Sequence, residues 1–159
     1  MIHYLIVFLI SMVPLIEMRV AIPYGLALAE EFELSSILIY VIAIIGNCIP
    51  IPFILFFVHK ILTWMENSRV ALFRKIASFI IEKGHRGLAK VQKYANLGLY
   101  LFVAIPLPGT GAWSGALIAA LLDMKKRYAF LTIALGVITA GLIIWLLTHG
   151  VLAGLEFLL

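Results

Sequence analysis

The sequence predicts an all-helical integral membrane protein that forms a single domain, residues 1–159. Hydrophobic residues make up 64% of the chain and charged residues only 13%, and the mean hydropathy is +1.14. Water-soluble domains contain about 45–50% apolar and about 25% charged residues, so this composition excludes a soluble fold. Charge-free stretches cover 34–58, 94–122 and 128–155, and each is longer than the ~20 residues that cross a hydrocarbon core.

Two kinds of hydrophobic segment can be distinguished. Segments 34–59 and 127–149 have the length and composition of transmembrane helices. Segments 2–29 and 95–122 contain residues that interrupt a helix, so each is predicted to form two arms of about ten residues joined by an unwound tip. Such a re-entrant hairpin enters and leaves the membrane on one side. The predicted hairpin-tip residues are Pro14, Pro23, Pro106, Pro108, Gly109 and Gly111.

The charges of the connecting segments predict the orientation in the membrane. Connector 60–94, expected to be an amphipathic helical segment, contains eight Lys and Arg residues between 60 and 93, and loop 123–127 contains three more. Cytoplasmic loops carry an excess of such residues, so we expect both segments in the cytoplasm and the acidic loop 30–33 outside. Four plain spans would separate the two basic segments, whereas two hairpins keep them together. The expected location is a cell membrane, with a multi-pass topology.

The two ends of the chain resemble each other. Residues 1–59 (repeat 1) and 95–159 (repeat 2) are each predicted to contain a hairpin followed by a transmembrane helix. Three residue pairs share an offset of 90 positions: Gly25 and Gly115, Glu33 and Asp123, and Gly46 and Gly136. Because the predicted topology gives the repeats opposite orientations, the pattern is that of an inverted-repeat secondary transporter.

Glu17 and Arg19 are the only charges inside a hydrophobic segment. Placing an ionisable group at membrane depth costs about 2.5–3.5 kcal/mol on insertion scales, so such residues usually mark a functional pathway. Glu17 is a candidate to bind a proton or a cation, and Arg19 is a candidate to hold an anion. The alternative is a mutual ion pair that only stabilises the hairpin.

Polar groups elsewhere extend this candidate proton- and substrate-binding site. Thr110 contributes a hydroxyl to the second tip, where backbone N–H groups at the start of a half-helix attract anions. Asn47 either lines the cavity or bonds a carbonyl freed by the nearby prolines. The chain shows no metal-ligand spacing, nucleotide-binding loop or nucleophile–base constellation, so neither a metal, a cofactor nor an enzymatic activity is expected.

Small residues predict close packing between helices. The predicted packing glycines are Gly25, Gly46, Gly111, Gly115 and Gly136. Glycine lets two membrane helices approach closely, and the faces at Gly111, Gly115 and Gly136 offer a surface for a homodimer. The expected partners are the lipid bilayer, a small-molecule or lipid substrate, protons as a candidate coupling ion, and a second copy of the chain. Nucleic acid is excluded, because the basic residues follow the pattern of cytoplasmic loops.

Three stretches together resemble a known family. Pro14–Pro23, Gly46-Asn47 and Pro106–Leu117 are similar to the putative small multidrug export protein family of prokaryotes, and the resemblance covers nearly the whole chain. It implies a small membrane protein distantly similar to the DedA superfamily, whose members have paired re-entrant hairpins. Some DedA-type proteins are tied to proton-dependent transport and to movement of lipid phosphates. Their second hairpin typically carries an arginine, whereas the tip here is Thr110-Gly111, a departure that argues against phosphate-lipid transport.

These observations favour secondary transport of a small or lipid-like solute, with Glu17 as the candidate for proton coupling. One alternative is a DedA-type phosphate-lipid flippase, in which Arg19 and the tip amides hold the head group. The other alternative is a membrane scaffold or assembly factor that transports nothing.

Overall fold

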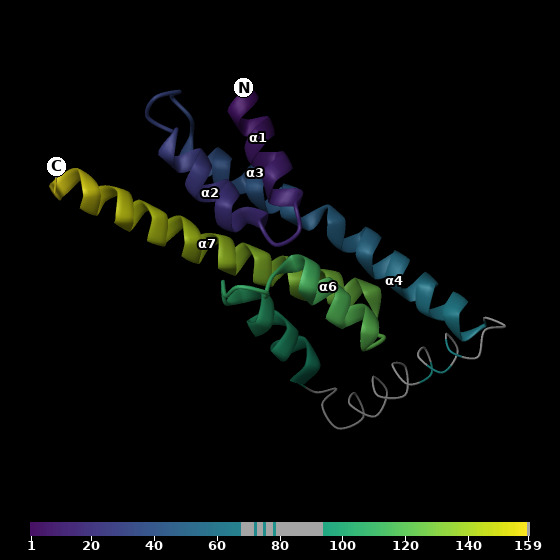
Figure 1. The fold of residues 1–159 in the computed structure, drawn as a ribbon. Coiled ribbons are helices and arrows are strands. Elements are labelled where there is room, and N and C mark those ends of the chain that lie inside the picture. The colour runs from purple at the N-terminus through teal and green to yellow at the C-terminus, as the bar shows by residue number, and fades with distance from the viewer. Residues whose placement is uncertain (68–71, 73–74, 76–77, 79–93, 159) are drawn as a thin grey trace.

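The structure is a computed structural model that describes residues 1–67 and 94–158 and the single positions 72, 75 and 78 (Figure 1). Over these residues all regular secondary structure is helical. The helices are α1 (Ile2–Met12), α2 (Glu17–Ala27), α3 (Ser36–Cys48), α4 (Pro50–Glu66), the short helix Tyr94–Ala104, α6 (Ala112–Leu121) and α7 (Lys126–Leu158).

Two helical stretches are long and apolar enough to cross a membrane. Ser36–Val58 covers α3 and the first half of α4, and Lys126–Val151 covers most of α7; both have a mean hydropathy of 2.5. The predicted span 34–59 is therefore divided between two helices, because Pro50 opens α4. Proline is favoured at the first position of a helix, where its missing N–H has no partner to lose. Helix α4 also continues to Glu66, beyond the predicted end of the span.

Helices α1 and α2 form a packed pair joined by residues 13–16, the first connection. Leu15 and Glu17 have left-handed backbone angles, with φ of 70° and 52°. Non-glycine residues rarely adopt such angles. Pro23, predicted at a tip, instead lies inside α2. The helix tolerates it at the cost of one hydrogen bond, the one that an N–H at this position would donate to the Arg19 carbonyl.

The helix Tyr94–Ala104 and α6 are joined by residues 105–111, the second connection. Pro106 and Pro108 prevent a continuous helix here, in agreement with their predicted position. Gly109 and Gly111 have φ of 84° and 130°. Glycine adopts these angles without steric cost, so the two glycines allow the chain to turn directly into α6.

The two pairs lie on opposite sides of the long helices. In Figure 1, α7 runs in the direction opposite to α3 and α4. Helix α2 packs against α1, α3 and α7, whereas α6 packs against α4 and α7. The first and second connections therefore face each other near the middle of the molecule (Figure 1).

The same close contacts occur in both parts of the chain. A Cβ atom added at Gly46 would lie 2.7 Å from the Phe8 carbonyl oxygen, and one added at Gly136 would lie 3.1 Å from the Tyr100 carbonyl oxygen. The loops before α3 and α7 also match, since each contains one left-handed residue, Glu33 (φ 49°) or Asp123 (φ 50°). Each loop closes with an equivalent backbone hydrogen bond, Leu34 N–H to Ala29 O at 2.8 Å and Met124 N–H to Ala119 O at 3.0 Å.

The core combines alanines with larger aliphatic side chains such as Met18, Ile39 and Ile133, and further large apolar residues cover the outside. Helix α6 buries a face made only of alanine and glycine: Ala112, Gly115, Ala116, Ala119 and Ala120. Large side chains such as Ile37, Leu135 and Leu147 are exposed along the two long helices. Because this surface would be unfavourable in water, it indicates contact with lipid.

The predicted packing glycines lie in contacts within the chain. Gly25 packs on Ile39 and Val7, and Gly115 and Gly136 both pack on Val103. The small-residue faces expected to be available for a homodimer are therefore occupied by the chain's own helices. Most of the predicted amphipathic connector 60–94 lies outside the described residues, and its first part, up to Glu66, belongs to α4.

Substituting Gly46 or Gly136 by alanine is expected to destabilise the protein by about 1–3 kcal/mol, because the new methyl group would overlap the Ser11 hydroxyl and the Phe8 carbonyl at Gly46, and the Val103 side chain at Gly136. Thermal unfolding in detergent, followed by tryptophan fluorescence, measures the effect. Gly98→Ala is the matched control, since a Cβ at Gly98 meets nothing within 4 Å. Equal unfolding temperatures for Gly46→Ala and Gly98→Ala would contradict the close approach.

Candidate functional site

Glu17 is buried where α2 meets α6. It is the first residue of α2, is 2% exposed, and its Oε1 accepts a hydrogen bond from the Trp113 N–H at 3.3 Å. The carboxylate thus lies at the N-terminus of α6, where unpaired N–H groups and the helix dipole favour a negative charge.

Gly111 makes this contact sterically feasible. It precedes α6, and a Cβ atom there would lie 2.8 Å from the Glu17 Cδ. Its φ of 130° is also unfavourable for other residues. Gly111 was predicted as a tip and packing residue, and its position against a carboxylate explains both features.

Arg19 joins α2 to the second connection. Its Nη2 donates to the Thr110 carbonyl oxygen at 2.6 Å and to the Thr110 Oγ1 at 2.8 Å. The Thr110 hydroxyl can in turn donate to the carbonyl oxygen of Ile105 or of Leu107, which lie 2.8 and 2.7 Å away. Arg19 therefore binds the group that holds the second connection in its folded conformation.

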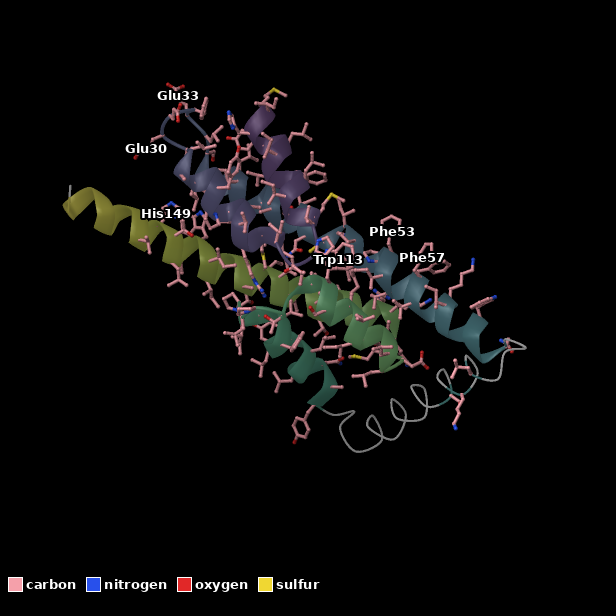
Figure 2. The ribbon with its side chains drawn as sticks, in the orientation of Figure 1. Glu30, Glu33, Phe53, Phe57, Trp113 and His149 are labelled. Carbon is pink, nitrogen blue, oxygen red and sulfur yellow. The ribbon has the colours of Figure 1, made fainter. Side chains whose placement is uncertain are left out.

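Trp113 makes a third bond between the two pairs. Its indole Nε1–H donates to the carbonyl oxygen of Met12 at 3.2 Å. Met12 is the last residue of α1, and the final carbonyls of a helix have no partner within it. Figure 2 shows Trp113 between the two pairs of helices. Hydrogen bonds therefore connect the pairs in both directions.

Asn47 contributes an amide from α3. It is fully buried and neighbours the Glu17 carboxyl group. Its amide is close enough to the Glu17 carboxyl group to form a hydrogen bond with it, and among the described residues Arg19 Nε has no hydrogen-bond partner. Leaving such a group unsatisfied costs about 1–3 kcal/mol. Glu17, Arg19 and Asn47 therefore bring a carboxyl group, a guanidinium group and an amide together inside the molecule.

The site thus unites all four predicted binding residues around one point, but in an unexpected arrangement. Glu17 accepts a hydrogen bond from Trp113, whereas Arg19 donates to Thr110. The two charged residues therefore do more than form a mutual ion pair. A carboxylate here can bind a proton or a cation. The guanidinium and the N-terminus of α6 can hold an anion.

Sequence reasoning missed the roles of Trp113 and Met12. Nothing in the sequence around Trp113 distinguishes an indole that bonds a distant carbonyl from one that packs among helices or lies at the membrane interface. The one available signal was its position two residues after Gly111, in the first turn of a half-helix. Among the described residues no group of three or more His, Cys, Asp or Glu side chains could hold a metal ion.

Replacing Thr110 by valine is expected to lower the free energy of unfolding by about 1.5–3 kcal/mol, because a hydrogen bond to a charged group is lost. Thr110→Ser keeps the hydroxyl and should unfold close to the wild-type temperature. Differential scanning fluorimetry in detergent provides the measurement. If valine and serine behave alike, Thr110 acts through its shape and not through its hydroxyl.

Comparison with known proteins provides one match. The family described as "Putative small multi-drug export protein" matches residues 17–143, which begin at Glu17 and include every polar contact of the site except the Met12 carbonyl. No curated protein and no solved structure matches the chain. Since the match covers most of the sequence, the chain belongs to the putative small multi-drug export protein family.

Proposed function

We propose that the protein is a secondary transporter in which Glu17 binds a proton or a cationic solute. The observation that carries this proposal is the contact between the buried Glu17 carboxylate and the N-terminus of α6. Charged groups at membrane depth are costly and mark transport pathways more often than structural sites. The family description favours export over catalysis.

The two helix pairs act in this proposal as re-entrant hairpins. Helices α1 and α2 contain 11 residues each and α6 contains 10. At 1.5 Å per residue these helices are about 15–17 Å long, roughly half the ~30 Å of a hydrocarbon core. Two such hairpins entering from opposite sides would meet at the midplane. The hydrogen bonds from Arg19 and Trp113 lie where this meeting would occur.

An inverted repeat is supported by the recurrence of local geometry. The matching loops at Glu33 and Asp123, and the matching contacts at Gly46 and Gly136, are each separated by 90 positions. The long helices that follow these loops run in opposite directions (Figure 1). Secondary transporters built on this plan bind substrate between the repeats, at broken helices near the midplane.

Protonation of Glu17 supplies the chemical step. The ionised carboxylate is attracted by the N-terminus of α6 and by Arg19, which lies close enough to stabilise it. Binding a proton or a cation cancels this attraction and weakens the link between the hairpins. Each hairpin could then separate on its own side, so that the site opens to one side at a time.

The contacts of Arg19 argue against the flippase alternative, in which Arg19 would hold a phosphate. Its Nη2 already bonds Thr110, so a phosphate would have to displace an existing contact. The free Nε leaves room for a single weaker interaction. We therefore place the coupling role on Glu17 and a positioning role on Arg19.

The first test concerns topology. In a Cys48→Ala background, cysteines introduced at Glu31 and Lys126 are expected to react with a membrane-impermeant maleimide from opposite sides, outside and inside respectively. Intact cells and inverted vesicles provide the two exposures. Labelling of both positions from one side would eliminate the hairpin topology, because four plain spans give that result.

The second test concerns transport. In proteoliposomes with an imposed proton gradient, the wild-type protein is expected to move a fluorescent lipophilic cation such as ethidium. Glu17→Gln should reduce this flux at least tenfold, because glutamine keeps the shape but cannot titrate. Absence of flux in the wild type under every gradient would favour the scaffold alternative.

A double substitution separates coupling from stability. Glu17→Gln removes the opposite charge nearest to Arg19, so a loss of thermal stability is expected whatever role Glu17 has. Adding Arg19→Gln removes the remaining charge together with the bonds of Arg19 to Thr110, and it should raise stability above that of the single variant only if the uncompensated charge is the larger cost. A coupling residue predicts that the stable double variant remains inactive. Full transport by a folded Glu17→Gln single variant would exclude Glu17 as the proton carrier.

A further inference from the structure

A second site lies away from Glu17, at one end of the two long helices. It is a groove of about 410 Å³ between α4 and the start of α7, and its volume falls within the ~300–1,000 Å³ of ligand pockets. The lining residues are Pro52, Phe53, Leu55, Phe56, Lys126 and Phe130. Phe53 projects from the outer face of α4 in Figure 2. The groove is apolar apart from a single lysine.

Two ammonium groups from different helices lie over one aromatic ring at this groove. Lys126 Nζ, from α7, is 5.0 Å from the centre of the Phe56 ring, and Lys60 Nζ, from α4, is 6.0 Å from it. Both distances are within the range of a cation–π interaction. The side chains of Lys60 and Lys126 are exposed, so both charges remain available to a ligand outside the protein.

The surrounding charges are predominantly positive. Lys125, Lys126 and Arg127 follow Asp123 in the loop before α7, and Lys60 is the first charge after the apolar part of α4. At the opposite end of the α3–α4 stretch, the start of α3 follows the acidic residues Glu30, Glu31 and Glu33. The groove therefore combines an aromatic channel for a hydrocarbon chain with a cationic rim at one end of the spans.

We propose that this groove binds an anionic phospholipid of the bilayer. The acyl chain lies along Phe53, Phe56 and Phe130, and the phosphate is held by Lys60 and Lys126. Positively charged residues near a membrane surface attract anionic head groups, and basic pockets between membrane helices recognise such lipids. This site is separate from the Glu17 site and does not depend on the transport proposal.

The charge pattern favours a lipid over a second copy of the chain. A symmetric dimer through this surface would place Lys126 and Lys60 of both copies close together, and like charges repel. A lipid brings the opposite charge together with a flexible chain that adapts to the groove. The aromatic side chains on α4 and α7 can contact the acyl chain of such a lipid.

The test is native mass spectrometry of the full chain with phosphatidylglycerol and phosphatidylcholine that have identical acyl chains. Wild-type protein should bind phosphatidylglycerol more tightly than phosphatidylcholine. Lys126→Gln and Lys60→Gln should each weaken phosphatidylglycerol binding roughly fivefold and leave phosphatidylcholine binding unchanged. Lys125→Gln is the matched control, because Lys125 does not line the groove; its effect should stay below twofold.

A second pair of variants tests the aromatic part of the groove. Phe53→Ala should weaken both lipids, whereas Phe57→Ala, an exposed residue one turn further along α4 that does not line the groove, should weaken neither. Thermal unfolding confirms that each variant is folded. Equal affinity of the wild type for both lipids, or equal effects of Lys125→Gln and Lys126→Gln, would overturn the proposal. If the wild type instead gives the mass of a dimer without bound lipid, and Phe53→Ala gives only the mass of a monomer, the groove is a dimer interface.

Discussion

The structure depends on one unfavourable requirement, namely that a carboxylate be kept out of water between two short helices. The N-terminus of α6 meets this requirement with its free N–H groups, one of which bonds Glu17. That arrangement explains several neighbouring features. Position 111 must lack a Cβ, α6 must begin immediately after it, and α2 must start at Glu17 with a left-handed residue. Two further hydrogen bonds lie next to this contact. Arg19 binds Thr110 in the second connection, and Trp113 binds Met12 at the end of α1.

Much of this fold follows from simple sequence features. Low charge and long apolar stretches predict helices in a membrane, and the prolines at 14, 106 and 108 predict where the short helices end. Two residues of the candidate site could also be predicted from the sequence, because Glu17 and Arg19 are isolated charges in an apolar segment. The resemblance to an export family is confirmed by a match over residues 17–143. These are properties of single segments, which a sequence displays directly.

Properties that depend on contacts between segments could not be obtained in this way. Pro23 was assigned to a tip, but packing of α2 on three other helices keeps that residue within a helix. Gly115 and Gly136 were assigned to a surface for a second copy, although both contact Val103 of the same chain. The indole of Trp113 reaches a carbonyl 101 positions away. In each case the partner is distant in sequence, and no local pattern identifies it.

The alanine face of α6 has a mechanical consequence. Large interlocking side chains resist sliding, because they must climb over one another when two helices shift. The buried face of α6 presents only methyl groups and one glycine, so the large side chains in this contact come from the neighbouring helices, as Val103 does at Gly115. The polar bonds of Trp113 to Glu17 and Met12 act at the first turn of α6 only. Small side chains along its length and polar bonds at its N-terminus therefore set the position of this helix together.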